Sequence, residues 1–243
     1  MSTSAHEHTG RGSTRTAVVW SGLEPVLGQQ TSGELDVLDI GGGTGGLAVR
    51  IGALGHRVVV VDPSPDALAA LDRRAREHDV AVTGRQGDLS TLLEVVGPAS
   101  ADLVLCHGVL EVVDDPAAAL GTLAQVVRPG GTLSLLVAQR HAAVVARAMA
   151  GHFRQALDLL DSQAQLGRSG RRFTVDELTA LVDEAGFTVD TVHAVRVFTD
   201  LVPGSLLDLE PGATAALVEL EQAVASRPEY LPLATQLHLL AHR

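Results

Sequence analysis

Cysteine and aromatic residues are scarce in this chain. Cys106 is the only cysteine among 243 residues, so the chain cannot form a disulfide within itself and has no cysteine-based zinc site. Phenylalanine, tryptophan and tyrosine make up 2% of the residues, whereas hydrophobic residues make up 46%. Valine, leucine and alanine must therefore build a large aliphatic core.

Long apolar runs are also absent. No run approaches the roughly 18 apolar residues that a membrane-spanning helix needs, and the N-terminus lacks the charged-then-apolar layout of a signal peptide. We therefore expect a soluble, cytoplasmic protein with no membrane partner. The 18 basic and 29 acidic residues give a net charge of −11. This balance argues against an extended nucleic-acid footprint but leaves room for a local basic patch.

The most informative stretch runs from Leu35 to Ala48 and reads LDVLDIGGGTGGLA. An apolar run is followed by five glycines and then by an apolar helical pattern, which predicts a strand, a tight turn and a helix. The glycines are Gly41, Gly42, Gly43, Gly45 and Gly46. Glycine permits positive φ and close approach of a ligand. The start of the next helix favours a phosphate or the carboxylate of an amino-acid-like ligand. The pattern fits both dinucleotide-binding and S-adenosylmethionine-binding turns.

Strand and helix patterns alternate after this turn. Further strands are expected at residues 57–62, 80–85, 102–107, 132–138, 187–198 and 237–243, and helices at 15–28, 65–78, 89–96, 115–127, 174–185 and 213–226. The alternation predicts an α/β, Rossmann-like, doubly wound fold with a mostly parallel, seven-stranded sheet. We expect residues 1–14 to form a flexible tail, residues 15–243 to form one domain, and residues 139–173 to form an inserted helical lid.

The ends of the expected strands carry the candidate ligand-binding side chains, because ligands bind at the carboxyl ends of parallel strands. Asp62 ends the second strand and can accept hydrogen bonds from ribose hydroxyls, as in both NAD and S-adenosylmethionine sites; the alternative is a helix cap. Polar groups from Gln86 to Asp88 can contact an adenine and favour S-adenosylmethionine; Asp88 can instead cap the next helix. His107 ends the fourth strand, either beside the cofactor or as a core histidine. Cys106 is expected to be a core residue.

A further motif comes before the fifth strand. Arg128 to Leu133 reads RPGGTL, in which proline stops a helix and two glycines make a tight turn. With the glycine turn, this motif resembles the class I S-adenosylmethionine-dependent methyltransferases. The chain is more closely similar to the bacterial tRNA carboxymethoxyuridine carboxyl methyltransferases, from Arg15 to its end. The similar segments include LDIGGGTG (38–45), CHGVLEVVDDPAAAL (106–120), MAGHFRQA (149–156), VRVFTD (195–200) and LVELE (217–221).

The resemblance implies a set of cofactor contacts. Arg15 would bind the carboxylate of S-adenosylmethionine, and Asp62 would bind its ribose. Gln86 and Gly87 would flank the adenine, and His107 would also contact the cofactor. The complete set of implied cofactor residues is Arg15, Gly41, Gly42, Gly43, Asp62, Gln86, Gly87 and His107.

The acceptor is less well indicated than the cofactor. The tRNA enzymes that this chain resembles carry a run of lysines in the lid, whereas residues 159–172 here offer only Arg168, Arg171 and Arg172. We expect Arg196 to orient an anionic acceptor such as a carboxylate, which needs no general base. No catalytic base and no metal ligand is assigned. The alternatives are a small-molecule O- or N-methyltransferase, a non-catalytic S-adenosylmethionine-binding protein and an NAD-dependent oxidoreductase. The sequence does not indicate an oligomeric state.

Overall fold

The fold is described from a computed structural model of the chain. The structure describes residues 3–28, 33–161, 170–207 and 210–243, with side chains from residue 14 onward. Arg168, which belongs to the expected lid, lies outside the described residues.

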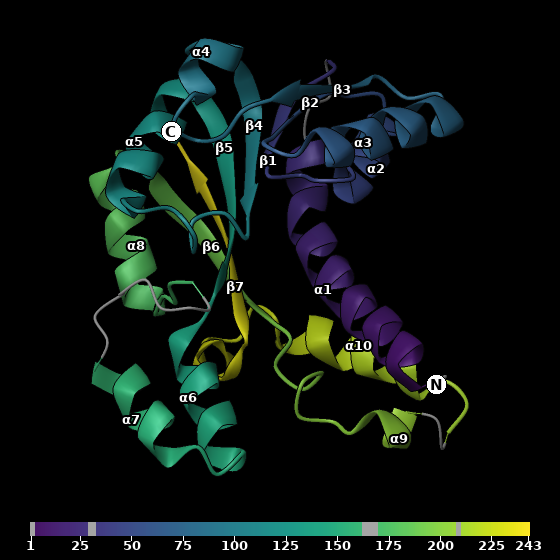
Figure 1. The fold of residues 1–243 in the computed structure, drawn as a ribbon, viewed down its shortest axis with the longest axis vertical. Helices are drawn as coiled ribbons and strands as arrows, with labels where there is room; N and C mark the ends of the chain where they lie inside the picture. The colour runs from purple at the N-terminus through teal and green to yellow at the C-terminus, as the bar shows by residue number, and fades with distance from the viewer. Residues whose placement is uncertain (1–2, 29–32, 162–169, 208–209) are drawn as a thin grey trace.

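A seven-stranded sheet forms the centre of the molecule, in the order β3-β2-β1-β4-β5-β7-β6. Its strands are β1 (Asp36–Ile40), β2 (Arg57–Asp62), β3 (Val82–Gln86), β4 (Ala101–His107), β5 (Val127–Ala138), β6 (Thr188–Val195) and β7 (Gln236–His242). β1 to β5 are parallel, and β7 runs antiparallel to β5 and β6. The predicted fold class is confirmed, and all carboxyl ends of the parallel strands meet at one edge (Figure 1).

Helices cover both faces of the sheet (Figure 1). Apolar residues of α1 (Thr3–Gly28), α2 (Gly46–Gly52) and α3 (Pro65–His78) pack on one face, and those of α4 (Leu92–Val96), α5 (Pro116–Val126) and α8 (Val175–Glu184) pack on the other. The remaining elements are α6 (Arg140–Met149), α7 (Phe153–Asp161), α9 (Gly204–Leu207), α10 (Ala213–Val224) and the 3-10 helix η1 (Pro228–Leu233). None of the helices in the described ranges is long and apolar enough to cross a membrane.

Local sequence signals explain several of these elements. Three of the four valines of β2 are buried and Val59 is partly buried, as expected for a parallel strand covered on both faces. Ser64 caps α3 by accepting a hydrogen bond from Ala67 N, with Pro65 at the first helical position. Thr174 and Glu177 form the expected capping box at the start of α8.

The N-terminal helix is longer than the sequence indicates. We expected a helix from residue 15 and a separate tail before it, but α1 begins at Thr3. Its second half packs on the sheet, and helix propagation from a packed segment costs little, so serine, threonine and glycine do not end it. α1 also contacts α10 beyond the carboxyl ends of the strands (Figure 1).

The fifth strand begins earlier than expected, at Val127 instead of residue 132. Its pairing with β4 jumps from Ala101–Val127 to Leu103–Thr132, so the RPGG segment forms an irregularity within the strand. Gly130 adopts φ 78°, which explains why glycine is needed there. The helix η1 between α10 and β7 was not anticipated, because two prolines obscured its pattern.

The segment between β5 and α8 contains α6 and α7, which form a helical hairpin beyond the carboxyl ends of the strands (Figure 1). Gln139 caps α6 by accepting a hydrogen bond from Ala142 N. Arg140 is nearly buried and forms an ion pair with Glu177 at 2.6 Å, which ties the hairpin to α8. The helical character of this segment agrees with the sequence, while its action as a lid stays a prediction.

Candidate active site

The glycine turn after β1 has the geometry that its sequence predicts. Gly41, Gly43 and Gly45 adopt φ values of 68°, 56° and 73°, which L-residues with side chains rarely adopt. Gly41 N donates a 2.8 Å hydrogen bond to Val61 O and fixes the turn to β2. A Cβ on Gly41 would lie 2.6 Å from Val109 Cγ2. The turn therefore leaves bare backbone facing the end of β4.

The carboxylate of Asp62 is fixed by this turn. Asp62 Oδ2 accepts a 3.0 Å hydrogen bond from Gly43 N, and Oδ1 accepts a 2.8 Å hydrogen bond from Ser64 N. The residue is only 7% exposed. Each carboxylate oxygen keeps a second lone pair, so the group can still accept hydrogen bonds from a pair of ribose hydroxyls.

A cavity of about 690 Å³ opens at the carboxyl ends of β1, β2, β3 and β4, a volume within the roughly 300–1,000 Å³ that is typical of small-molecule sites. Four of the expected cofactor residues line it: Gly41, Asp62, Gly87 and His107. Apolar residues on its walls include Ile40, Val61, Leu89, Val109, Val112 and Val113. The cavity thus joins the carboxylate of Asp62 to a largely apolar slot.

The other expected contacts lie around this cavity instead of on its wall. Gly42 faces Asp39 under the turn, and Gly43 holds Asp62. The side chain of Gln86 is exposed and donates a 3.4 Å hydrogen bond to Pro63 O. The cavity is also lined by Asp88, whose Oδ1 accepts hydrogen bonds from the Ser90 backbone and hydroxyl. These bonds lower the pKa of Asp88 and stabilise the turn before α4, but the N-cap of that helix is Thr91, so Asp88 is not the helix cap considered as an alternative.

A buried carboxyl lies beneath the turn. Asp39 is 4% exposed, and its burial, reinforced by the negative charge of Asp62, raises its pKa to about 7. A Cβ on Gly42 would overlap this carboxyl group. Asp39 therefore packs directly against the backbone of the glycine turn.

His107 faces the cavity at the end of β4. Its Nε2 lies 2.8 Å from Ser134 Oγ, and Ser134 Oγ lies 2.9 Å from His238 Nε2. Burial, followed by the positive charge of Arg15, lowers the pKa of His107 to about 3, so the ring is neutral at physiological pH. The neighbouring Cys106 is fully buried, and burial raises its pKa to about 12, which confirms a core role.

A second polar cluster surrounds Glu111, just after β4. Glu111 Oε1 accepts a 2.8 Å hydrogen bond from Ala138 N at the end of β5. Its Oε2 is sealed from solvent and has no hydrogen-bond partner among the described residues. Burial raises the pKa of Glu111, although the charges of Arg15 and Arg172 oppose this shift.

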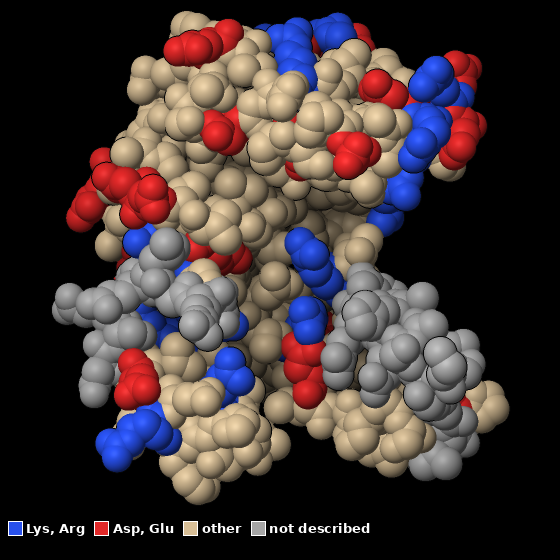
Figure 2. Space-filling model, viewed as in Figure 1, with Lys and Arg blue, Asp and Glu red and all other residues tan. Residues whose placement is uncertain are grey.

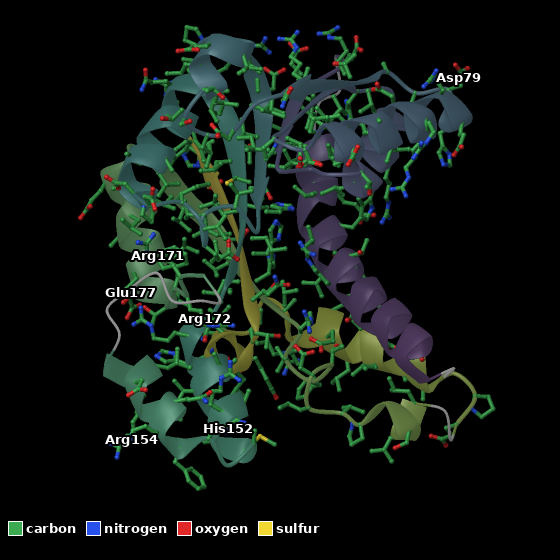
Figure 3. All side chains as sticks on the ribbon, in the orientation of Figure 1. Asp79, His152, Arg154, Arg171, Arg172 and Glu177 are labelled. Atoms are coloured by element: carbon green, nitrogen blue, oxygen red, sulfur yellow. The ribbon has the colours of Figure 1, made fainter. Side chains whose placement is uncertain are left out.

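Arg15 of α1 and Arg172, which precedes α8, both lie near this cluster. Burial lowers the pKa of both guanidinium groups, and each is also close to a second arginine, Arg196 and Arg147 respectively. Within the described parts of the chain, neither forms an ion pair with a carboxylate. Figure 2 shows basic side chains along the walls of the hollow in the middle of this face, and Figure 3 places Arg172 on the side of α6 that faces the sheet.

Arg196 follows β6 in a left-handed backbone conformation with φ 60°. Its guanidinium forms an ion pair with Asp200, so it is already held by a carboxylate. The loop after it is anchored by Glu221 of α10, which is fully buried and accepts hydrogen bonds from the backbone N–H groups of Val197, Phe198 and Thr199. The Thr199 hydroxyl also contacts Glu221, at 2.6 Å.

The same anchor reaches the N-terminal helix. The hydroxyl of Thr199, whose proton is donated to Glu221, lies within hydrogen-bond distance (3.1 Å) of the hydroxyl of Thr14, the residue before Arg15. Glu221 thereby connects α10, the loop that carries Arg196 and the segment that carries Arg15. The structure brings Arg15 close to Arg196 and His107, as their electrostatic interactions require.

The residues present fit a sulfonium nucleoside bearing an amino-acid tail. The bare glycine backbone, the fixed Asp62 carboxylate, the apolar slot and the nearby Arg15 match its ribose, adenine and carboxylate parts. A family model described as a methyltransferase domain matches residues 18–192. The chain belongs to the S-adenosylmethionine-dependent methyltransferases. This family membership decides against the oxidoreductase alternative.

Comparisons with individual proteins agree with this assignment. The methyltransferase is 30% identical to the tRNA 5-carboxymethoxyuridine methyltransferase of Escherichia coli K12, over 97% of this chain and 90% of that protein. It is 35% identical to a ubiquinone biosynthesis O-methyltransferase of Xanthomonas campestris, over 47% of this chain and 48% of that protein. The magnesium protoporphyrin IX methyltransferase of Synechocystis PCC 6803 with bound S-adenosylhomocysteine shares the fold, with a TM-score of 0.66, 16% identity and coverage of 97% and 86% of the two chains.

Four residues of the methyltransferase were not singled out from the sequence as site residues: Glu111, Ser134, Glu221 and His238. Glu111 and Glu221 lie in LEVV and LVELE, segments noted only as points of resemblance. Glu221 interrupts the apolar face of a helix, and a carboxylate there must be paired once it is buried. Ser134 and His238 interrupt apolar strands in the same way. A polar residue within an otherwise apolar pattern was the sequence signal that could have identified these four residues.

Proposed function

We propose that this methyltransferase transfers the methyl group of S-adenosylmethionine to a carboxylate on a modified uridine of tRNA. The observation that carries the proposal is the similarity to the E. coli tRNA 5-carboxymethoxyuridine methyltransferase over almost the entire length of both proteins. Half-buried arginines at the acceptor side of the site supply a second, independent argument.

The charge distribution of the hollow suits an anionic acceptor. Arg15 and Arg172 lie near Glu111, and neither has a carboxylate partner among the residues that the structure describes. Two guanidinium groups beside a single buried carboxyl leave positive charge that water screens poorly. With Arg15 bound to the carboxylate of the cofactor, Arg172 can bind the carboxylate of the acceptor by charge-assisted hydrogen bonds, which arginine forms in pairs.

The chain's own part in the reaction is to bind and orient. S-adenosylmethionine supplies an activated methyl group on sulfur when it is bound. Asp62 and the glycine turn hold the nucleoside, and Arg15 holds its carboxylate. Arg172 and the Arg196 loop present the acceptor at the ends of β4 and β5. A carboxylate is already ionised at neutral pH, so no residue has to remove a proton, and positioning accounts for the acceleration.

The proposal is tested with tritium-labelled S-adenosylmethionine, bulk tRNA and a protein-free metabolite extract. We expect label in tRNA, and we expect mild alkali to release it as methanol, because methyl esters hydrolyse whereas methyl ethers and methylamines do not. Label that remains on tRNA after alkali treatment would contradict carboxylate methylation. Label confined to the metabolites would contradict a tRNA acceptor.

A matched pair of glycine variants ties the transfer to this site. Gly41→Ala introduces a Cβ that meets Val109 at a residue with positive φ, so we expect binding of S-adenosylhomocysteine to weaken about thirtyfold. Gly130→Ala is the control, because Gly130 has a similar φ of 78° but nothing within 4 Å of its would-be Cβ. Isothermal titration calorimetry measures both. Equal losses in the two variants would mean that backbone strain, and not the cofactor turn, sets the affinity.

A small-molecule acceptor is the second candidate. The partial similarity to a ubiquinone biosynthesis O-methyltransferase supports it, and so do the exposed apolar side chains Met149, Phe153 and Leu157 on the α6–α7 hairpin. In the labelling experiment this candidate predicts alkali-stable label in the metabolite extract. The two candidates therefore predict different results for both the tRNA sample and the metabolite extract.

A further inference from the structure

A row of polar side chains crosses the sheet from the cofactor cavity to α1. His107 of β4 lines the cavity, Ser134 of β5 lies beside it, and His238 of β7 follows. Ser134 and His238 are both fully buried. The single hydroxyl of Ser134 therefore connects the Nε2 atoms of two imidazole rings.

The hydroxyl can donate to only one of the two rings. A serine hydroxyl has one proton, and a neutral imidazole has one N–H and one acceptor nitrogen. Burial lowers the pKa of both His107 and His238, so both rings are neutral near pH 7. One ring must therefore donate its Nε2–H to Ser134 Oγ, and the other must accept the serine proton at Nε2.

The far end of the row decides the direction. His238 Nδ1 is sealed from solvent and has no partner among the described residues. Gly22 of α1 covers it, because a Cβ on Gly22 would lie 3.0 Å from that nitrogen. If Ser134 donated to His238, the sealed Nδ1 would carry a proton with no acceptor. Buried N–H groups without acceptors are rarer than buried acceptors without donors. The proton of His238 is therefore on Nε2.

We propose that Ser134 and His238 are positioning residues that hold His107 with its proton on Nδ1, so that His107 offers a neutral N–H donor to a carboxylate in the active site. His238 donates to Ser134, and Ser134 donates to Nε2 of His107. Nδ1 of His107 is not among the sealed atoms and has no partner in the described part of the protein.

The chemistry of the neighbours fits a carboxylate. The positive charge of Arg15 acts on His107 and contributes to the lowered pKa of its ring, so a carboxylate that accepts from Nδ1 is also attracted by that charge. That carboxylate belongs either to the amino-acid end of the cofactor or to the acceptor. In both cases the fixed tautomer prevents His107 from acting as a base, since Nδ1 carries its proton and Nε2 accepts from Ser134. The inference rests on the cofactor site and is independent of the acceptor's identity.

Nitrogen-15 NMR of histidine-labelled protein measures the tautomer directly. The chain has ten histidines, and the His107 signals are identified by their absence in His107→Asn. We expect a protonated Nδ1 and an unprotonated Nε2 in the wild-type protein. A proton on Nε2 of His107 would overturn the proposal, and this measurement needs no variant at Ser134 or His238.

Ligand titrations then separate the two sources of the carboxylate. If the Nδ1–H signal shifts on adding S-adenosylhomocysteine, the cofactor's carboxylate accepts the hydrogen bond. If the shift appears only when the tRNA of the methyl-transfer assay is added as well, the acceptor's carboxylate accepts it. A signal that shifts with neither ligand would contradict the proposal that His107 Nδ1–H donates to a carboxylate.

Two amide variants test the donor atom by affinity. The side-chain amide nitrogen of asparagine can stand in for Nδ1 of histidine, and that of glutamine can stand in for Nε2. For the ligand that shifts the signal, we expect His107→Asn to bind within about threefold of wild type and His107→Gln to bind about tenfold more weakly. The opposite ranking would contradict a donor at Nδ1.

Ser134→Ala tests the positioning role itself. Without the serine proton, we expect the His107 signals to show a mixture of both tautomers and the ligand affinity to fall several-fold. Ser100→Ala is the control, because the Ser100 hydroxyl donates only to Gly97 O in a distant turn. A folded Ser134→Ala protein with wild-type His107 signals would remove Ser134 from the mechanism. If this variant does not fold, the wild-type spectrum and the amide pair still decide the tautomer.

Discussion

The cofactor half and the acceptor half of the active site are built in different ways. The cofactor half uses backbone atoms and side chains from residues 35–107, namely the glycine turn, Asp62, Gly87 and His107. The proposed acceptor half gathers long side chains from distant segments: Glu111 after β4, Arg172 before α8 and Arg196 after β6. Arg15 of α1 lies near both halves, since its charge acts on His107 and on Glu111. Local geometry fixes the first half, whereas the second exists only after the whole chain has folded.

The two halves also treat a buried carboxyl differently. Asp39, under the glycine turn, is pressed against backbone and lies near Asp62, so its charge is unfavourable. Glu221, behind the Arg196 loop, accepts four hydrogen bonds from residues 197–199. Asp39 therefore makes the free energy of unfolding depend on pH, whereas Glu221 fixes the conformation of the Arg196 loop.

The largest expected effect concerns Asp39. The folded protein keeps this proton up to about pH 7, whereas the unfolded chain releases it near 3.8. Because the folded state binds more protons within this window, the contribution of Asp39 is most favourable below pH 3.8 and is lost as pH rises to 7. Relative to Asp39→Asn, wild type should lose up to about 4 kcal/mol of unfolding free energy between pH 4 and 7. Urea unfolding at several pH values measures the difference.

Other titrating groups occur in both proteins and cancel from this comparison. Asp183→Asn provides the control, since Asp183 is exposed on α8. Its stability curve should run parallel to that of wild type. A parallel curve for Asp39→Asn as well would show that Asp39 is ionised in the folded protein, and the contrast between the two buried carboxyls would disappear.

The next largest effect is expected for Glu221→Gln. The amide has only one acceptor oxygen, and its NH2 group would face a backbone N–H of residues 197–199. We expect the unfolding free energy to fall by about 3 kcal/mol. The specificity constant kcat/KM for the acceptor should fall more than the affinity for S-adenosylhomocysteine, because the Arg196 loop loses its anchor.

Glu219→Gln is the matched control for this change. Glu219 is exposed on the same helix, so this variant should behave as wild type in urea unfolding and in steady-state assays. Losses of equal size in cofactor affinity and acceptor kcat/KM for Glu221→Gln would show that the anchor supports the whole site. The division into two halves would then have no energetic basis.

Sequence patterns recovered the cofactor half because its determinants are local. The strand–glycine–helix order predicted the turn, and the ends of β2, β3 and β4 predicted Asp62, Gly87 and His107 on the cavity. Each of these positions follows from strand period and turn chemistry within a few residues. The sheet, its helices and the α8 capping box followed from the same short-range rules.

The acceptor half was recovered only in part, because its contacts join residues far apart in the sequence. Asp200, the ion-pair partner of Arg196, lies only four residues further along the chain, but nothing near Arg196 indicates that Glu221 of α10 anchors the loop that follows it. Nothing near Ser134 indicates that its hydroxyl joins two histidines from other strands. The sequence shows that such residues are polar at positions where the periodicity predicts an apolar residue. It does not show their hydrogen-bond partners, which come from other elements in the folded protein.

The smallest effect, and the one that most directly concerns the acceptor, is expected for Arg172→Ala. Arg172 is half-buried beside Glu111, so its charge acts at short range and is poorly screened. We expect KM for a carboxylate acceptor to rise about tenfold with little change in the affinity for S-adenosylhomocysteine. Arg154→Ala is the control, since Arg154 is exposed at the far end of the hairpin (Figure 3) and its charge is screened at physiological salt. Equal effects of the two variants would point to diffuse attraction of a polyanion, whereas an effect of Arg172 alone requires direct recognition of the carboxylate in the hollow.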